Sequence, residues 1–450
     1  MAFENFGGTV LQRSDPEFES ARFGWNGMID RQPAVIARCS SPDDVIAAVR
    51  YAADNDLLAI ARCGGHSVSG ASLAEGGMMV DLAGLKTITI DPETRIANVG
   101  GGVLLGELDA ATQAHGLAVT AGIEPETGVA GLTLGGGIGV LVRKLGLTID
   151  NLIGAQVVLA DGSLIETDAN SHPDLFWALR GGGGQFGIVT RFDFQLHPIG
   201  PQIVTAQAYY PLEKAQEVGA FVENFMRGAP DDTTLVPVFM TVPDVEVLPA
   251  EWRGKHVAAM VACDVGPEDT ARNRLAPMLE LDDLVLGFID TMPYVDFQKT
   301  FAGASPHGAR YYWKSIFVDE ITDDLVDVLV EGLKELDGEY SQIFMETLGG
   351  AVSRVALEDT AFANRSSPYN LGISAGWVDP AKDDEIIGAV RRLYDRLRPF
   401  SDGTVYLNYL DRDEIARAKE GFGPHFGRLQ EVKQRYDPEN RFGGPLGGAG

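Results

Sequence analysis

The chain has 450 residues, of which 45% are hydrophobic, and its 36 basic and 64 acidic side chains give a formal net charge of −28. This length exceeds what one small core requires, so we expect two domains or two lobes, each with its own apolar interior. The acidity excludes nucleic acids and anionic membranes as favoured partners, because such a surface repels phosphate groups.

Cysteine usage and the N-terminal residues indicate the compartment. The three cysteines, Cys39, Cys63 and Cys263, are too few for a disulfide framework and lack the CxxC spacing of zinc or thioredoxin-like sites. The first residues include no basic segment followed by an apolar run, and no stretch approaches the ~20 apolar residues of a membrane span. We therefore expect a soluble, cytoplasmic protein with no membrane partner.

Helices, strands and glycine-rich loops alternate through the first two hundred residues. Ser41-Pro42-Asp43-Asp44 is typical of a helix N-terminus, and the apolar run 57–61 after that helix predicts a buried strand. A glycine-rich loop, 62–70, follows this strand. The pattern then predicts a strand at 78–82, hairpins that turn at 91–94 and 161–162, helices at 104–115 and 173–179, and a strand at 187–196.

The residue pattern changes after 197–201, which predicts a domain boundary there. Glycine clusters become rarer, and amphipathic helices alternate with short β-like runs, as in an antiparallel sheet backed by helices. The tail has one more predicted strand, from Val405 to Tyr409, and a helix at 426–436. The helices predicted before the tail are 212–226, 267–279, 322–336 and 380–397, and the strands are 235–242, 257–263, 342–348 and 370–378.

Glycine-rich loops are the strongest chemical signal in the first part of the chain. Without side chains, backbone N–H groups can approach an anion closely, as in pyrophosphate-binding loops, although tight turns also use glycine. Gly182 to Gly187 matches GxGxxG, but it lies between a helix and a strand, the reverse of the dinucleotide-binding order. His66 lies in the first loop, and no second histidine stands at metal-ligand spacing. We predict a nucleotide ligand, no Rossmann fold and no metal site.

Several motifs, in their order along the chain, resemble those of the berberine-bridge-enzyme-like flavoproteins. The resemblance covers residues from about 33 to 200 and from about 400 to 443 by motif order, and the middle of the chain by its general pattern only. The motifs are Arg62 to Gly70, Asp81-Leu82, Gly122 to Gly139, Lys144 to Leu147 with Asp150-Asn151, Asp174 to Gly183, Tyr406 to Tyr409, and Tyr436 to Phe442.

The resemblance implies an α+β fold with two lobes. An FAD-binding domain of the p-cresol-methylhydroxylase type would comprise residues 1–200 and 401–450, closed by the C-terminal segment. A substrate domain of antiparallel sheet backed by helices would comprise residues 201–400.

The resemblance also implies which residues hold the flavin. In this family the histidine that matches His66 is bonded to the flavin 8α-methyl carbon, and such a link generally raises the flavin potential. Many relatives have a second link through a cysteine, but Glu124 occupies that position here, so we expect attachment through His66 alone. Glu124 is either a substrate-binding group or a solvated carboxylate. The predicted FAD-binding residues are Arg62, Gly64, Gly65, His66, Ser67, Gly70, Gly122, Thr127, Gly128, Gly131, Gly135, Gly136, Gly137, Gly139, Gly187, Val189 and Asn408.

The implied chemistry is hydride removal from carbon, with a base that takes the proton. The family matches that base to Tyr409, beside Asn408. An unperturbed phenol titrates near ~10, so a nearby positive charge or hydrogen bond has to stabilise the phenolate. Strand alternation places Gln342, Phe344 and Glu346 on one face, and relatives use this strand to line the site. The predicted catalytic residues are Tyr409, Asn408, Glu346 and Gln342.

Two further patterns leave alternatives open. The aromatic and basic cluster at 310–313 either shapes a pocket for a planar substrate or packs in the core. Gly372 to Gly376 matches GxSxG, and Asp413 and His425 follow Ser374 in the order of an α/β-hydrolase, but continuing apolar alternation places Ser374 inside a strand. A serine hydrolase and a flavin-binding protein without turnover are therefore the less favoured interpretations.

The sequence thus favours an FAD-dependent oxidase that takes a hydride from a C–OH or C–N group of a small metabolite and passes the electrons to O2, giving H2O2. A dehydrogenase with another electron acceptor is the alternative. Thr127 bears on this choice, because it lies in the loop that would border flavin C4a. The expected partners are a small-molecule substrate and O2 or another acceptor, with the chain a monomer or a homodimer.

Overall fold

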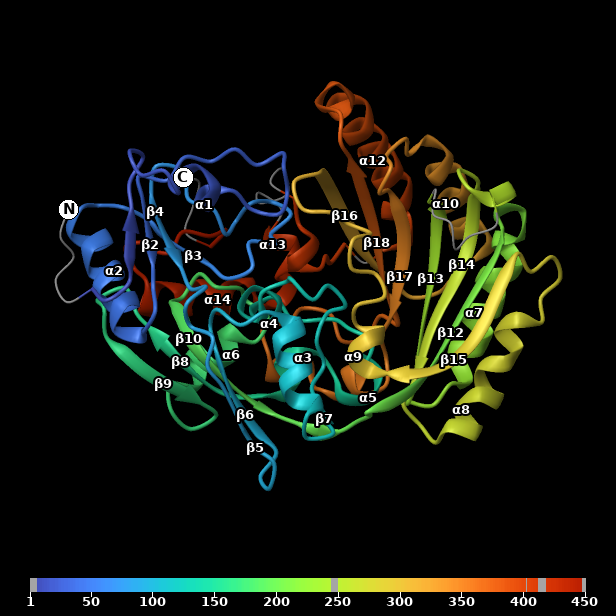
Figure 1. Ribbon diagram of the computed structural model, residues 1–450, viewed down its shortest axis with the longest axis horizontal. Helices are drawn as coiled ribbons and strands as arrows, with labels where there is room; N and C mark the ends of the chain where they lie inside the picture. Colours follow the sequence, from blue (N-terminus) through green and yellow to red (C-terminus); the bar gives the residue numbers. More distant parts are fainter. Residues whose placement is uncertain (1–5, 244–249, 402, 412–417, 447–450) are drawn as a thin grey trace.

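The computed structural model describes residues 6–243, 250–401, 403–411 and 418–446. These residues form two lobes of mixed helix and sheet, which are the left and right halves of Figure 1. The predicted α+β, two-lobed fold class is confirmed, whereas the domain boundaries near residues 200 and 400 stay a prediction.

The N-terminal part of the first lobe is built on a four-stranded sheet with one antiparallel edge strand and three parallel strands. Helix α2 (Pro42–Asp54) begins where the sequence predicts it. Ser41 Oγ accepts a hydrogen bond from the Asp44 N–H at 3.2 Å, and the Asp44 carboxylate accepts one from the Ser41 N–H at 3.1 Å. The strands, in sheet order, are β1 (Thr9–Leu11), β2 (Val35–Arg38), β4 (Met78–Asp81) and β3 (Ala59–Arg62).

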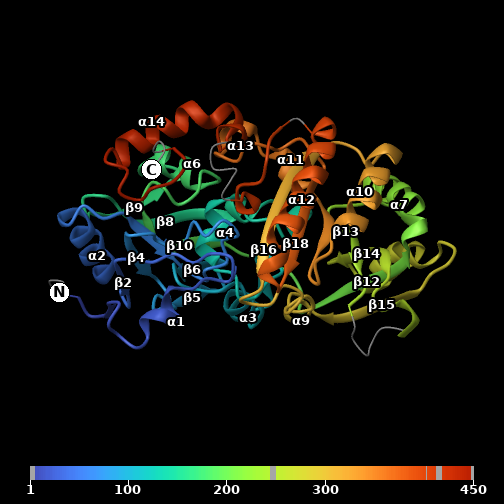
Figure 2. The same ribbon diagram turned by 90° about the horizontal axis from the view of Figure 1, so that it is seen from above.

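A five-stranded antiparallel sheet completes the first lobe and contains both predicted hairpins. The last helix of the chain, α14 (Phe426–Tyr436), returns to this lobe and lies beside α6 (Pro173–Leu179), as Figure 2 shows. The first lobe is therefore built from both ends of the chain. Its strands, in sheet order, are β5 (Ile88–Asp91), β6 (Ile96–Gly100), β10 (Ile188–Gln195), β8 (Leu152–Val158) and β9 (Leu164–Asp168). Its other helices are α1 (Phe18–Arg22), α3 (Leu105–Gln113), α4 (Val129–Leu134) and α5 (Val142–Leu145), and β7 (Leu117–Ala118) pairs with β11 (His197–Pro198).

The second lobe is a seven-stranded antiparallel sheet with helices packed on one face. The predicted helices and strands of this part are present, and three strands that the sequence pattern did not predict, β12, β15 and β16, complete the sheet. In sheet order the strands are β15 (Leu286–Pro293), β12 (Gln202–Pro211), β14 (His256–Asp264), β13 (Thr233–Thr241), β17 (Gln342–Thr347), β18 (Tyr369–Trp377) and β16 (Arg310–Val318). The covering helices are α7 (Ala215–Gly228), α8 (Glu268–Leu275), α10 (Asp323–Glu335) and α12 (Asp383–Leu397), while α9 (Tyr294–Phe297) and α11 (Ala351–Arg354) are short.

The strand predicted from Val405 to Tyr409 is wrong. This segment contains a 3₁₀ helix, η8 (Leu407–Tyr409), in which the Tyr409 N–H donates to the Tyr406 carbonyl at 3.0 Å. The Tyr406 N–H donates to Ser315 Oγ at 3.3 Å, so it makes no ladder bond to a strand. The 3₁₀ turn places the side chains of this segment around the lobe interface instead.

Ser374 lies in the middle of β18, paired on both sides by β17 and β16, and is fully buried. A nucleophile elbow needs a sharp turn from strand to helix, which this serine does not occupy. His425 packs edge-on against Trp177 in the first lobe, with ring centroids 5.4 Å apart, and Asp413 lies outside the described residues. The structure contradicts the serine hydrolase interpretation.

Buried polar contacts join the two lobes. Arg365 forms a bidentate ion pair with Asp150, with N–O distances of 2.7 and 2.8 Å, and both side chains are buried. Arg143 donates to the backbone carbonyls of Thr233 at 2.9 Å and Leu348 at 2.7 Å. Because a buried charge is stable only with such partners, these contacts fix how the lobes face each other.

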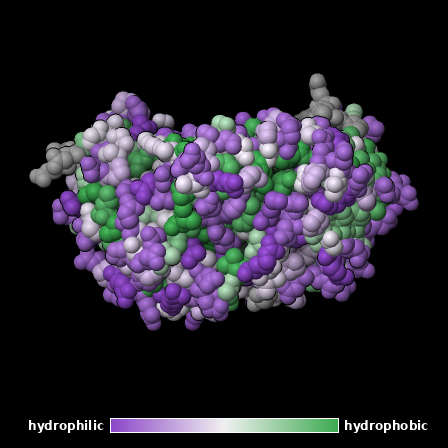
Figure 3. Space-filling view, turned by 90° about the horizontal axis from the view of Figure 1, so that it is seen from below, coloured by the Kyte–Doolittle hydropathy of each residue, from purple (hydrophilic) through white to green (hydrophobic). Residues whose placement is uncertain are grey.

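The surface is polar, as the composition predicts. Figure 3 shows a face dominated by hydrophilic side chains, with apolar ones in small groups between them. Within the described ranges, no helix combines the length and the apolar character that crossing a membrane requires. The exposed large hydrophobic side chains are Phe23, Leu58, Ile123, Ile153, Leu164, Phe288 and Val378.

Candidate functional site

A cavity of about 1660 Å³ lies between the glycine-rich loops of the first lobe and the seven-stranded sheet. Alternation along β13 explains which sheet face it meets: Val236 and Val238 line the cavity, whereas Leu235 belongs to the core that packs on the helices. The cavity is larger than the ~300–1,000 Å³ typical of a single ligand site, so it has room for a cofactor and a second molecule together.

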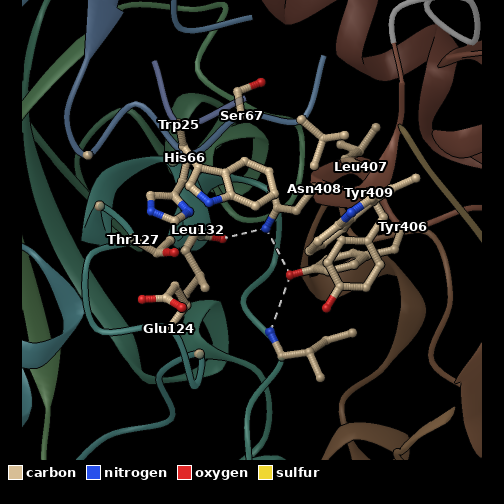
Figure 4. Close-up of a pocket in the computed structure, with 18 of the residues that line it drawn as sticks. Trp25, His66, Ser67, Glu124, Thr127, Leu132, Tyr406, Leu407, Asn408 and Tyr409 are labelled. Atoms are coloured by element: carbon tan, nitrogen blue, oxygen red, sulfur yellow. Dashed lines mark hydrogen bonds between the residues drawn. The ribbon is translucent and has the colours of Figure 1, made fainter. Parts of the chain in front are cut away.

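His66 borders this cavity from within the glycine-rich loop that follows β3. Its imidazole stacks on Trp25, with ring centroids 5.1 Å apart and an interplanar angle of 19° (Figure 4). The buried Nε2 atom has no hydrogen-bond partner among the described residues. Burial lowers the pKa of His66 to about 4, so the ring is neutral near pH 7 and offers a free nitrogen lone pair.

Glycines let the loops of the first lobe approach one another. A Cβ on Gly64 would lie 2.5 Å from the backbone nitrogen of Gly128, so this crossing of two loops requires glycine. At Gly131, which lines the cavity, a Cβ would meet no atom within 4 Å. The loops therefore pack closely against each other at Gly64 and Gly128, while the backbone at Gly131 faces open space in the cavity. Such a surface fits a flat or phosphate-bearing cofactor.

Most of the predicted FAD-binding residues line this cavity. Those that line it are Gly64, Gly65, His66, Ser67, Gly122, Thr127, Gly128, Gly131, Gly135, Gly139 and Asn408. Those placed outside its lining are Arg62, Gly70, Gly136, Gly137, Gly187 and Val189. Arg62, for example, donates to the Ala21 carbonyl at 2.5 Å and lies beside Asp81, so it supports the loop from behind.

Tyr406 and Asn408 bind the glycine-rich segment from the other end of the chain. Tyr406 Oη accepts hydrogen bonds from the N–H groups of Gly137 at 3.1 Å and Ile138 at 3.2 Å, and from Asn408 Nδ2 at 2.8 Å. Asn408 Nδ2 also donates to the Leu132 carbonyl at 3.0 Å (Figure 4). The C-terminal segment therefore fixes the loop that borders the cavity, and Asn408 serves this network as well as lining the cavity.

Tyr409 and Glu346 form a pair at the cavity wall. Tyr409 Oη donates a hydrogen bond to Glu346 Oε1 at 2.8 Å. Glu346 keeps some surface exposure because it borders the cavity, yet the surrounding protein raises its pKa to about 7, mainly by removing water from the carboxylate. Burial first, and then the Glu346 charge, raise the pKa of Tyr409 well above its ordinary value. The expected stabilisation of a Tyr409 phenolate is therefore wrong, because its hydrogen-bond partner is a carboxylate.

The sheet face of the cavity is largely apolar. Alternation along β17 directs Gln342, Phe344 and Glu346 into the cavity, as predicted. Glu346 is the one charged side chain among the described strand residues that line it. The other strand residues on this wall are Gln207, Tyr209, Thr234, Val236, Val238, Met240, Ala259, Val261, Cys263, Trp313 and Thr347.

The aromatic cluster at 310–313 divides between the two predicted roles. Trp313 lines the cavity and lies edge-on to Tyr409, with ring centroids 5.2 Å apart. Tyr311 stacks on Trp25 at 3.8 Å, and Tyr312 packs in the core of the second lobe. Trp313 Nε1 is buried and has no hydrogen-bond partner among the described residues, so one N–H donor remains for a ligand.

Glu124 lines the cavity in the loop before Thr127. Burial raises the pKa of its carboxyl group, and the Glu126 N–H lies 3.4 Å from Glu124 Oε1. The Cys63 thiol donates to the Val103 carbonyl, with Sγ and O 3.4 Å apart, and burial raises its pKa to about 11. A thiol with such a pKa is a weak nucleophile, in agreement with its predicted structural role.

Sequence reasoning missed Trp25 and Tyr406 as site residues. Trp25 comes from an irregular segment and reaches His66 only through the tertiary fold. Tyr406 stands in a recognised motif but was not assigned a role, and its two backbone donors depend on the loop geometry. Gly182, Gly183 and Gly184 line the cavity although the GxGxxG reading of that segment does not apply.

Two segments of the chain match known families. Residues 33–168 match the FAD binding domain, and residues 405–447 match the berberine and berberine-like family. An uncharacterized FAD-linked oxidoreductase of Bacillus subtilis is 29% identical over 442 residues, which cover 97% of this chain and 95% of the relative. The (R)-6-hydroxynicotine oxidase of Paenarthrobacter nicotinovorans is 28% identical over 449 residues, which cover 97% and 95%.

Solved structures share the whole architecture. A 6-hydroxy-D-nicotine oxidase from Arthrobacter nicotinovorans superimposes with a TM-score of 0.86 at 27% identity, covering 97% of this chain and 96% of that one. A berberine-bridge-enzyme-like protein of Physcomitrella patens gives 0.88 at 23% identity, covering 98% and 96%. The berberine bridge enzyme of Eschscholzia californica gives 0.84 at 22% identity, covering 97% and 95%. The last two likenesses show the fold alone.

Proposed function

Because the chain belongs to the berberine-bridge-enzyme-like FAD-linked oxidoreductases, we propose that it is a cytoplasmic oxidase of a small metabolite, acting on a C–OH or C–N group. Residues 1–200 and 401–450 would bind FAD, and residues 201–400 would bind the substrate. The observation that carries this proposal is that His66 and the Tyr409–Glu346 pair border one cavity. When bound, the flavin would supply the two-electron acceptor, taking a hydride from carbon and passing both electrons to O2 to give H2O2.

We propose that FAD is attached covalently through His66 alone. The free, neutral ring nitrogen of His66 supports this, because an imidazole must be unprotonated to form a bond to carbon. Stacking on Trp25 would hold the ring in one orientation. Glu124 occupies the position where many relatives have the second, cysteine link, and a carboxylate cannot form a thioether there.

Glu346 and Tyr409 would accept the proton that the substrate loses. Tyr409, which lines the cavity, would take a proton from the C–OH or C–N group while its own proton moves to Glu346 Oε1, 2.8 Å away. In this arrangement the carboxylate is the final proton acceptor, which its pKa of about 7 suits near neutral pH. Trp313 Nε1 and Gln342 would orient the substrate, and the apolar wall would exclude water.

Cofactor attachment is tested by acid precipitation of the purified protein. We expect a yellow pellet from the wild type, because a covalent flavin stays with the denatured chain. His66→Ala should release its flavin into the supernatant, whereas His172→Ala, a change on the surface of the first lobe, should not. A colourless protein that cannot be reconstituted with FAD would contradict the proposed function as a whole.

The electron acceptor is tested by stopped-flow reoxidation of the reduced protein. Rapid return of the oxidised flavin spectrum in air, with one H2O2 formed per flavin, is expected for an oxidase. Recovery over minutes would favour the alternative, a dehydrogenase with a non-oxygen acceptor. Thr127 lines the cavity in the loop that would border the flavin, so Thr127→Leu should slow reoxidation by narrowing the approach of O2.

A further inference from the structure

Cross-strand pairing between β17 and β18 places a particular partner opposite each cavity residue of β17. Glu346 lies directly opposite Asn370 in the antiparallel register, and Gln342 lies opposite Ser374. Side chains at directly opposite positions have Cβ atoms ~4.5–5.5 Å apart and lie on the same face of the sheet. The register therefore fixes Asn370 beside the Glu346 carboxylate, independently of side-chain flexibility.

Asn370 is fully buried, and its amide is bonded to Glu346. Asn370 Nδ2 donates to Glu346 Oε2 at 2.6 Å, while Tyr409 donates to Oε1 at 2.8 Å. Each carboxylate oxygen thus accepts one hydrogen bond from these two side chains. Asn370 itself is not among the cavity-lining residues, so it can act on the reaction only through Glu346.

The surroundings of Glu346 make the Asn370 amide important for stabilising the charge of its carboxylate. The titratable groups that face the carboxylate are the phenols of Tyr409 and Tyr406, both neutral at physiological pH. Among the described residues no cation belongs to this set, so hydrogen bonds offset the negative charge of Glu346 there, and a hydrogen bond to a charged group is among the stronger kind. Tyr409 has to give up its proton during the proposed reaction, whereas the Asn370 amide keeps its donor throughout.

We propose that Asn370 is a positioning residue that holds the Glu346 carboxylate in its ionised form and turns one oxygen toward Tyr409. The proposal rests on the proposed function of Glu346 as the final proton acceptor. Asn370 Oδ1 is buried and has no hydrogen-bond partner among the described residues. An asparagine at this position therefore leaves one buried acceptor unsatisfied, which a role in packing alone would not favour.

The test measures the pKa of Glu346 without a substrate, so it can fail while the proposed function stands. Difference infrared spectra between each protein and its Glu346→Gln derivative isolate the carbonyl stretch of the protonated Glu346 carboxyl group as a function of pH. Asn370→Leu keeps a similar volume and removes the donor. We expect the Glu346 titration to move upward by about one to two pH units, the equivalent of one lost hydrogen bond to a charge.

Two further variants make the result specific. Ser374→Ala changes another buried polar side chain of the same strand, opposite Gln342, and should leave the Glu346 titration unchanged. Asn370→Thr keeps one hydroxyl donor, so its Glu346 titration should lie between those of the wild type and Asn370→Leu. This variant also provides the test if the leucine variant does not fold. A Glu346 titration in Asn370→Leu that matches that of Ser374→Ala would overturn the proposal.

With a reducing substrate, the same variants should separate positioning from packing. Asn370→Leu should move the lower limb of the pH profile of flavin reduction upward by the same interval as the infrared titration. A loss of rate that is equal at every pH would assign Asn370 a packing role and contradict the proposal.

Discussion

Glu346 and Tyr409 share one hydrogen bond, and each changes the proton affinity of the other. The bond from Tyr409 lowers the pKa of Glu346 against the effect of burial, while the Glu346 charge raises the pKa of Tyr409. As the pH rises through about 7, Glu346 loses its proton and becomes able to accept one. The pair therefore combines a phenol near the substrate with a carboxylate that titrates near neutral pH.

Replacing either member of the pair should slow flavin reduction. Tyr409→Phe should keep the flavin and slow reduction by about 10² or more, the scale of a lost acid–base group. In the wild type the rate should rise with pH up to about 7 and then level, and Glu346→Gln should lose this dependence. Stopped-flow absorbance of the flavin band, with an amine or alcohol that reduces the wild type, measures both effects.

Tyr436→Phe is the matched control for Tyr409→Phe. Its hydroxyl donates to Asp174 at 2.8 Å in the same C-terminal segment but away from the cavity. An unchanged rate in Tyr409→Phe would remove this tyrosine from the mechanism, whereas a slowed Tyr436→Phe would point to a general effect of the segment.

The sequence predicts the residues of the site better than their interactions. Motif order identified His66, Asn408 and Tyr409, and strand alternation identified Gln342 and Glu346 as neighbours on one face. The bond between Tyr409 and Glu346 was not predicted, because 63 positions separate them and only the packing of the C-terminal segment on the sheet brings them together. For the same reason the tertiary partners Trp25 and Asn370 carry no local signal.

At the scale of elements, aromatic side chains of the neighbouring strands β16 and β17 require glycine at two positions of β18. Gly372 lies opposite Phe344 in the register, and a Cβ on Gly372 would approach the Phe344 ring to 2.5 Å. A Cβ on Gly376 would approach the Tyr311 ring to 2.7 Å. The two glycines of the GxSxG match thus make room for aromatic rings and serve no nucleophile elbow.

Gly372→Ala should displace Phe344 toward the cavity. Phe344 lies edge-on to Tyr409, with ring centroids 5.9 Å apart, so we expect slower flavin reduction at unchanged flavin content. Overpacking should also lower the free energy of unfolding by about 1–3 kcal/mol. Stopped-flow reduction and thermal or urea unfolding measure the two effects.

Gly388→Ala in α12 provides the comparison. A Cβ there would lie 3.3 Å from the flexible end of Arg392, and alanine favours a helix over glycine by about 0.5–1 kcal/mol. The variant should be slightly more stable and reduce its flavin at the wild-type rate. If Gly372→Ala behaves in the same way, the close contact with Phe344 is not a constraint on the site.

Element prediction from sequence succeeded where one local signal dominates. The capping box of α2, both hairpin turns and the amphipathic helices of the second lobe are local patterns, and they were predicted. Strands β12, β15 and β16 were missed, because their identity depends on partners distant in sequence. The strand predicted at 405–409 was wrong, because a short run of apolar and aromatic residues fits a strand and an irregular turn equally well.

At the scale of the whole molecule, the lobes meet around a buried acid. Asp109 on α3 is 3% exposed, and Gln298, which follows α9, donates to it at 3.2 Å and to the Gly122 carbonyl at 3.2 Å. Burial raises the pKa of Asp109 to about 7. The Tyr294 hydroxyl nearby is buried and has no hydrogen-bond partner among the described residues. The interface between α3 and α9 therefore favours the protonated, neutral form of Asp109.

Asp109 should make stability fall as the pH rises. The pKa of Asp109 is higher in the folded protein than its ordinary value of 3.8. Its contribution to the free energy of unfolding is therefore complete below about pH 4 and is lost progressively as the pH rises to about 7. Asp109→Asn should remove this loss and be more stable than the wild type above pH 7, by at most about 4 kcal/mol. Urea unfolding at pH 5 and pH 8 measures the difference.

Asp296→Asn, on the exposed side of α9, should show no such gain between the two pH values. Equal pH dependence in wild type and Asp109→Asn would mean that Asp109 is ionised in the folded protein and that solvent reaches the lobe interface.

The return of the C-terminal segment to the first lobe sets an order of events during synthesis. The Ala59 N–H of β3 donates to the Arg441 carbonyl at 2.8 Å, and Tyr406 secures the loop at Gly137 and Ile138. His66 is synthesised long before Tyr406 and Arg441. Before Tyr406 and Arg441 are synthesised, the nascent chain can fold the first lobe only in part. We therefore expect the proposed attachment of flavin to follow the synthesis of Arg441, whose carbonyl binds β3.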